Sequence, residues 1–89
     1  MKLTLLSRAY CHLCDEMLAE VRPIAKAHDA VVEVIDVDEP RYAALEAEWG
    51  ERVPALFAGE PANGALLCHY HLDRERVLSA LREPPVTSR

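Results

Sequence analysis

Apolar residues recur along the first third of the chain with two different periods, which predict a strand followed by a helix. Residues 3–6 form a short apolar run typical of a buried strand. After a turn over residues 7–10, apolar side chains return at steps of three and four from Cys14 to Ala25, as on the buried face of a helix. Pro23 lies within this pattern, and we expect a kink or break there because proline lacks a backbone N–H and crowds the preceding turn.

A second strand and a second helix are predicted from the next apolar stretch. Residues 31–37 are rich in β-branched side chains and almost continuously apolar, which indicates a strand covered on both faces. Pro40 follows two acidic residues and marks the start of a helix, since proline suits the first helical position. This helix is predicted to run to about Trp49 and to stop at Gly50. The residues expected on its buried face are Ala44, Leu45 and Trp49.

The last third of the chain predicts a hairpin and a third helix. Residues 53–58 and 65–70 have the composition of strands, and the segment between them is dense in Gly, Pro and Asn, so the two strands are expected to pair. Asp73 is an N-cap candidate for a helix that runs to about Arg82. The residues that this helix is expected to bury are Val77, Leu78 and Leu81.

The predicted order of elements is β-α-β-α-β-β-α. The first helix can serve as a crossover between parallel strands, whereas the closing hairpin has to be antiparallel. The simplest closure is an α/β fold with a four-stranded mixed sheet and helices on both faces. We expect one domain over residues 1–83 and a short flexible tail over residues 84–89.

Composition and charge narrow the choice of partners. A hydrophobic fraction of 51% in 89 residues is enough for one core without disulfide staples. The formal net charge of −5 and the lack of a basic run argue against binding to nucleic acid or to an anionic membrane. No apolar run approaches the roughly 20 residues of a membrane span. The chain is expected to be a monomer.

Cysteine usage indicates a reducing compartment. Three cysteines are an odd number, unlike the even sets of disulfide-stapled secreted domains. Residues 1–6 form too short a segment for a signal peptide. We therefore expect the chain in the cytoplasm, where a Cys-x-x-Cys pair is typically catalytic or metal-binding rather than a permanent staple.

Cys11-His12-Leu13-Cys14 is the most informative motif of the chain. It falls where the first predicted strand gives way to the first helix, so one sulfur is expected at the helix N-terminus and the other one turn further in. This spacing suits a reversible disulfide. The unpaired amides of the helix N-terminus favour a thiolate at Cys11, whereas the acidic residues of the first turn oppose it.

The element order, the Cys11-x-x-Cys14 motif after the first strand and Val53-Pro54 at the start of the third strand together resemble glutaredoxins and other thioredoxin-like proteins. Over nearly its whole length the chain is most similar to small bacterial glutaredoxin-like proteins. The resemblance implies a thioredoxin-like fold and a thiol–disulfide oxidoreductase that serves cell redox homeostasis and electron transfer. Cys11 would be the exposed nucleophile and Cys14 the buried resolving thiol. Pro54 would be cis and face this pair, and the backbone beside it at Val53 would pair with the substrate.

The resemblance also implies substrate contacts and partners. Arg8 stands where glutaredoxins often carry a cation for a glutathione carboxylate, and Asp73 stands near the acidic helix start that receives the γ-glutamyl end. His12 belongs to the same substrate-binding set, and a protonated His12 would favour the thiolate together with Arg8. The expected partners are a disulfide-containing protein or glutathione as a co-substrate. Neither a tightly bound cofactor nor a metal is expected.

The chain departs from the family pattern at three places. His12-Leu13 replaces the usual Pro-Tyr between the cysteines, and residues 69–72, His-Tyr-His-Leu, replace a Gly-Gly pair before the last helix. Since glycine lets a ligand backbone approach closely, the bulky residues predict weak activity with glutathione. Tyr10 stands where thioredoxins carry a tryptophan.

Two other classes of function are consistent with the same residues. Cys11 and Cys14, joined by Cys68 or His12, could supply soft ligands to a metal, and Cys11 could bridge two chains through an iron–sulfur cluster. A structural zinc site usually has four ligands in two pairs, and the sequence has one pair. The fold could also act as a redox-silent adaptor. Outside such a site, Cys68 is interpreted as a small buried side chain.

Overall fold

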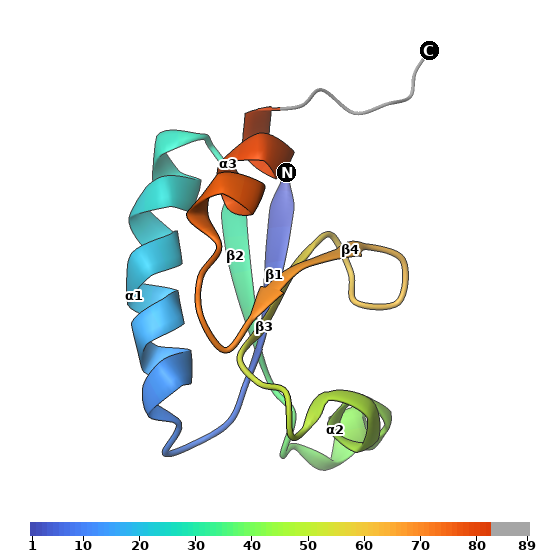
Figure 1. Cartoon of the computed structure of the whole chain (residues 1–89). Helices are drawn as coiled ribbons and strands as arrows, with labels where there is room; N and C mark the ends of the chain where they lie inside the picture. The colour runs from blue at the N-terminus through green and yellow to red at the C-terminus, as the bar shows by residue number, and fades with distance from the viewer. Residues whose placement is uncertain (83–89) are drawn as a thin grey trace.

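The computed structural model describes residues 1–82, and its elements follow the predicted order (Figure 1). The elements are β1 (Lys2–Ser7), α1 (His12–Ala27), β2 (Val31–Asp36), a 3-10 turn (Pro40–Tyr42), α2 (Ala43–Trp49), β3 (Ala55–Ala58), β4 (Ala65–His69) and α3 (Arg74–Arg82). Residue 83 and the predicted tail over residues 84–89 lie outside the described residues, so the predicted domain boundary stays a prediction.

The four strands form one mixed sheet in the order β2-β1-β3-β4. Strand β1 runs parallel to β2, with Leu5 opposite Val34, and antiparallel to β3, with Leu5 opposite Leu56. Strands β3 and β4 form the antiparallel hairpin expected from the turn-rich segment between them. The four-stranded mixed sheet predicted from the sequence is therefore confirmed.

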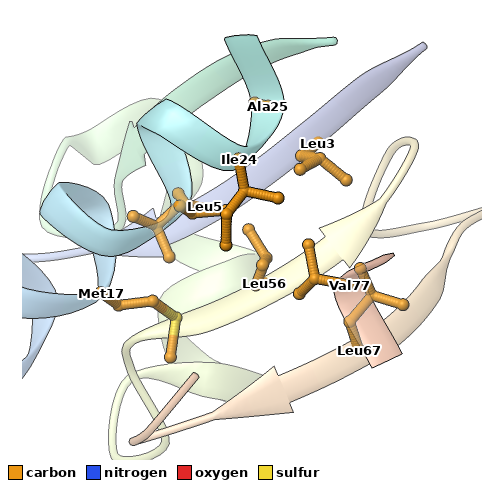
Figure 2. Close-up of a cluster of buried hydrophobic side chains, with 9 residues drawn as sticks. Leu3, Leu5, Met17, Ile24, Ala25, Leu56, Leu67 and Val77 are labelled. Atoms are coloured by element: carbon orange, nitrogen blue, oxygen red, sulfur yellow. The ribbon is translucent and has the colours of Figure 1, made fainter. Parts of the chain in front are cut away.

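Helices α1 and α3 pack on one face of the sheet, and α2 lies on the other (Figure 1). Figure 2 shows Met17, Leu56 and Val77 converging from a helix, a strand and a second helix. Burial of each such side chain contributes roughly 1.5–3 kcal/mol, so their packing holds α1 and α3 against the sheet. The buried members of this α1-side cluster are Leu3, Leu5, Met17, Val21, Ile24, Ala25, Leu56, Leu67 and Val77.

The opposite face of the sheet carries a smaller cluster that contains one of the two motif cysteines. Successive residues of a strand point to opposite faces, so Leu5 joins the α1-side cluster and Leu6 joins the other. Cys14 reaches this cluster from the first turn of α1. The buried members of this α2-side cluster are Leu6, Cys14, Ile35, Val37, Val53, Ala55 and Phe57.

We predicted a kink or a break at Pro23; helix α1 continues through Pro23 to Ala27, so a break is wrong. Pro23 is exposed, whereas Val21 and Ile24 on either side of it are buried against the sheet. The packing of these neighbours holds the helix together although Pro23 donates no backbone hydrogen bond.

Strand β2 lies at an edge of the sheet, and the prediction that both of its faces are covered is wrong. Val31 is 63% exposed and Val34 is 41% exposed. Because β2 has a neighbouring strand on one side only, its side chains pack less completely than those of the central strand β1.

The second helix is shorter than predicted and begins as a 3-10 turn. Pro40 occupies its first position and Gly50 follows its last residue, as expected. Ala44 is exposed rather than buried, because a helix of seven residues presents only a narrow stripe to the sheet. Leu45 and Trp49 are half-buried, and the Trp49 ring packs edge-on against the Phe57 ring with 5.1 Å between centroids.

The third helix starts as predicted, because the Asp73 carboxylate accepts a hydrogen bond from the N–H of Arg76 over 3.2 Å. Val77 is buried, and the other two apolar residues of the expected face, Leu78 and Leu81, are half-buried. Strand β3 begins at Ala55, two residues later than predicted, since the preceding proline has no N–H for a strand ladder. None of the helices within residues 1–82 is long and apolar enough to cross a bilayer.

Candidate redox site

Cys11 and Cys14 are joined by a disulfide at the start of α1, with 5.2 Å between their Cα atoms. Cys11 is the N-cap residue of this helix and has extended backbone angles, φ −108° and ψ 107°. Cys14 lies in the first turn and is 1% exposed, whereas Cys11 is only half-buried. The two cysteines therefore differ in exposure, and Cys11 is the more accessible of the pair.

The helix N-terminus supplies a donor to the more accessible sulfur. The backbone N–H of Cys14 donates a hydrogen bond to Cys11 Sγ over 3.1 Å, and the N–H of Asp15 donates to the Cys11 carbonyl oxygen over 3.1 Å. Amides at a helix N-terminus stabilise negative charge, which is the charge that a cysteine carries as a nucleophile. His12 follows Cys11 in the sequence and is the first residue of the helix. Its side chain is exposed.

The loop at Val53-Pro54 lies on the same side of the sheet as the cysteine pair. The peptide bond between Val53 and Pro54 is cis, and both residues are buried. The Val53 side chain belongs to the α2-side cluster together with Cys14, and Cys11 packs against the same cluster. The fold thus brings together two motifs that are about 40 residues apart in the sequence.

Arg8 is tied to the protein's own oxygen atoms. Its Nη2 and Nε donate to the two carboxylate oxygens of Asp38 over 2.6 and 3.2 Å, and its Nη1 donates to the Gly50 carbonyl oxygen over 2.7 Å. Nη2 also lies 3.3 Å from Oε2 of Glu46. The bond to Asp38 raises the pKa of Arg8 and lowers the pKa of Asp38. Arg8 therefore links the end of β1 to α2, and this set of bonds occupies three of its nitrogens.

Asp73 and Cys68 each have a structural role of their own in the fold. The Asp73 carboxylate caps α3, as described above. Cys68 lies on β4 opposite Leu56 and packs against the α1-side cluster, whereas Cys14 belongs to the cluster on the other face. Cys68 is half-buried rather than fully buried as the sequence had suggested, and this partial burial raises the pKa of its thiol. Across residues 1–82 no group of three or more His, Cys, Asp or Glu side chains is placed to hold a metal ion.

Two tyrosines beside the site have backbone angles that sequence reasoning did not anticipate. Tyr10, directly before the disulfide, has φ 58°, and Tyr70, directly after β4, has φ 66°. The Tyr70 N–H donates to the Pro54 carbonyl oxygen over 2.9 Å, and its hydroxyl donates to the Glu51 carbonyl oxygen over 2.6 Å. Tyr70 therefore ties the segment after β4 to the proline loop at two points.

A small groove lies between this segment and the disulfide motif. It has a volume of about 170 Å³ and lies between the first turns of α1 and the residues that follow β4. Its lining includes Leu13, which stands between the two cysteines, together with Tyr70 and His71. The replacement of the family's Gly-Gly pair by residues 69–72 could be read from the sequence. The left-handed backbone of Tyr70 could not.

The mixed sheet, the flanking helices and a disulfide at the start of the first helix define a thioredoxin-like fold with a Cys-x-x-Cys redox-type site. Residues 2–82 match the model of the family described as Glutaredoxin-like domain (DUF836). The chain therefore belongs to the glutaredoxin-like domain family, as the sequence motifs predicted.

Two solved structures have a similar fold. Protein Ne2328 from Nitrosomonas europaea is 37% identical, with a TM-score of 0.72 over 88% of this chain and 87% of its own. Thioredoxin 1 from Thermosipho africanus is 25% identical, with a TM-score of 0.65 over 91% of this chain and 90% of its own. A comparison with proteins of curated function gave no match.

Proposed function

We propose that this protein is a thiol–disulfide oxidoreductase in which Cys11 attacks and Cys14 resolves. The observation that supports this most directly is the difference between the two bonded sulfurs. Cys11 is half-buried at a helix N-cap and accepts an amide hydrogen bond, whereas Cys14 is 1% exposed one turn behind it. A nucleophile that is both reachable and stabilised, with a second thiol held close to it, is what dithiol exchange requires.

The reaction begins from the reduced dithiol. The Cys11 thiolate attacks one sulfur of the substrate disulfide, the substrate S–S bond breaks, and one substrate thiolate leaves as the mixed disulfide forms. The Cys14 thiol then loses its proton and attacks Cys11 Sγ, which releases the second substrate thiolate and forms the Cys11–Cys14 disulfide. Two electrons pass from the protein to the substrate, and two protons complete its thiols. The helix keeps Cys14 close, so the second step is effectively intramolecular.

Substrate contacts are proposed at the residues around this pair. The backbone at Val53, before Pro54, is suited to pair with an extended substrate chain, and His12 is exposed at the start of α1. We propose that the principal partner is a disulfide-containing protein. We also propose that the protein works as a monomer. We assign glutathione a lesser role as a co-substrate, because the bonds of Arg8 and Asp73 leave them poorly suited to hold it.

Return of the oxidised protein to the dithiol needs a thiol reductant. A low-molecular-weight thiol or a dithiol reductase could supply the two electrons by the same exchange in reverse. A reducing compartment such as the cytoplasm provides both classes of reductant, and this is where we propose that the protein works.

A single-turnover experiment tests the proposal without a choice of physiological reductant. The protein is reduced with dithiothreitol, freed of it, and mixed with an equimolar disulfide-linked peptide. We expect one equivalent of disulfide to be reduced, with a Cys11–Cys14 disulfide in the peptide map. The C11S variant should give no reduction. Wild-type protein that stays reduced in the presence of the peptide would show the proposal to be wrong.

A further inference from the structure

We propose that Tyr10 is a substrate-recognition residue that selects polypeptide disulfides with an apolar side chain beside the half-cystine. The inference rests on the proposed function, because it names the substrate class of the same site. Two observations carry it: the position of the Tyr10 side chain and the conformation of its backbone.

The Tyr10 side chain makes no packing or polar contact among the described residues. It is fully exposed, at 106% of the reference area for tyrosine. Within residues 1–82, neither a hydrogen bond, nor a ring contact, nor a cation contact of its side chain is found. Removal of the ring would therefore leave the packing of the protein as it is.

The backbone of Tyr10 is also unfavourable for this residue type. Its φ of 58° lies in the left-handed region, which glycine adopts readily and a bulky aromatic residue does not. Two other non-glycine residues share this conformation. Asp29 lies in the turn after α1, where a short polar side chain is well tolerated, and Tyr70 is held by two hydrogen bonds to the segment around the cis proline. Tyr10 has a strained backbone without any such contact.

Both observations indicate a contact that forms only with another molecule. Stability alone would favour glycine or asparagine at this turn, and strained residues of this kind gather at functional sites. Tyr10 is bonded in sequence to Cys11, the accessible half of the disulfide. An aromatic ring with a polar tip is well suited to a transient interface, where tyrosine is often an anchor.

The surrounding charges determine which disulfide fits. The chain has a formal net charge of −5, and Asp15 and Glu16 are exposed in the first turns of α1. The nearby cation, Arg8, donates to Asp38 and to the Gly50 carbonyl oxygen. A small anionic disulfide therefore meets like charge at the start of α1, where Arg8 is already bonded to the protein's own oxygen atoms. An uncharged polypeptide segment meets no such repulsion. An apolar side chain beside its half-cystine can pack against the Tyr10 ring.

The test compares three disulfides in single-turnover reactions with the reduced protein. The first is a disulfide-linked peptide dimer with leucine beside each cysteine, the second is the same dimer with serine there, and the third is dithiodiglycolate, a small anionic disulfide. The measured quantity is the selectivity, which is the second-order rate constant for the leucine peptide divided by that for each of the other two. The variants are Y10G, Y10N and Y10F.

We expect Y10G and Y10N to lose roughly tenfold in selectivity for the leucine peptide, as when an interface anchor is removed, and Y10F to keep it. Since glycine and asparagine relieve the left-handed strain, both variants should also unfold at a higher urea concentration than the wild type. D29G is the matched control: it relieves the same backbone conformation at the far end of α1 and should not change the selectivity.

The results that would contradict the role of Tyr10 can be told apart from a result that would contradict the proposed function. If Y10G keeps the wild-type selectivity, Tyr10 does not contact the substrate and the inference is wrong. An equal fall in all three rate constants would also overturn it, because Tyr10 would then act on Cys11 itself. If wild-type protein reduces none of the three disulfides, the proposed function fails and the inference falls with it.

Discussion

The backbone N–H of Cys14 donates to Cys11 Sγ over 3.1 Å, while the Cys14 side chain lies buried in the α2-side cluster. The same residue thus stabilises the accessible sulfur and keeps the second sulfur directly behind it. A reversible disulfide needs both features, since the attacking thiol must be reached from outside and the resolving thiol must be protected from outside.

The three thiols of the reduced protein should differ in reactivity. At neutral pH, iodoacetamide should modify Cys11 first, because Cys14 is 1% exposed and burial raises the pKa of Cys68 above its ordinary value of 9.0. Peptide mapping by mass spectrometry over a time course measures the order of modification. Preferential labelling of Cys68 or Cys14 in the folded protein would contradict this arrangement of the site.

Labelling of Cys68 should increase only at alkaline pH. Its pKa is raised in the folded protein, so the folded state holds this proton more tightly than the unfolded state. The resulting contribution to stability is complete below the unfolded value and is lost as the pH rises through the folded one. In C68S, urea unfolding should therefore show a smaller loss of stability above pH 9 than in the wild type. Equal pH profiles would argue against burial of this thiol.

Glutathione should reduce the oxidised protein slowly. The donors of Arg8 are engaged by Asp38 and Gly50, and Tyr70 brings a full side chain and two hydrogen bonds to the segment beside the proline loop. We expect Y70G to react several-fold faster, because its backbone already has the left-handed φ of 66° that suits glycine. Stopped-flow measurement of disulfide loss at millimolar glutathione gives both rates. Rapid reduction of the wild type, with no gain in Y70G, would be the contrary result.

The Arg8–Asp38 pair should contribute to acid stability. Arg8 lowers the pKa of Asp38 below its ordinary value of 3.8, so the folded state favours the ionised carboxylate. This contribution is present above pH 3.8 and is lost as the pH falls through the lowered value. The D38N variant should therefore be less stable than the wild type at pH 7, with a difference that shrinks toward pH 2 and at high salt. A difference independent of pH would point to packing rather than charge.

Pro23 offers a test of how α1 is held together. It is exposed inside a continuous helix, where proline costs about 3 kcal/mol relative to alanine in an isolated context. P23A should raise the free energy of unfolding by about 1–3 kcal/mol, because it restores a backbone hydrogen bond and removes the crowding of the preceding turn. Urea denaturation measures the change. A stability equal to or below that of the wild type would mean that the helix has adapted to the proline.

Most of the fold was predictable because apolar periodicity decides which elements form. The α1 face from Cys14 to Ala25 and the buried run of β1 needed only their spacing. Two of the errors have a common physical origin, since they depend on neighbours that are distant in sequence. Pro23 is tolerated because residues beside it pack on the sheet, and Val31 is exposed because β2 lies at an edge.

The candidate site was predictable in part for the same reason. The Cys11-x-x-Cys14 spacing and its place between strand and helix depend on local sequence, and both were found. The engagement of Arg8 by Asp38 and the Gly50 carbonyl oxygen depends on where the chain returns to the end of β1, which no local pattern encodes. The left-handed angles of Tyr10 and Tyr70 contradict the preference of their residue type, so they could be found only in the structure.

The central claim is that Cys11 attacks and Cys14 resolves, and trapping of the mixed disulfide tests it most directly. Reduced C14S is mixed with the leucine peptide dimer, with C68S as the matched control that keeps both motif thiols. We predict that C14S accumulates a stable adduct of one peptide on Cys11, seen by intact-mass spectrometry and peptide mapping, whereas C68S turns over and ends as the Cys11–Cys14 disulfide. An adduct on another cysteine, or no adduct with C14S, would contradict the account.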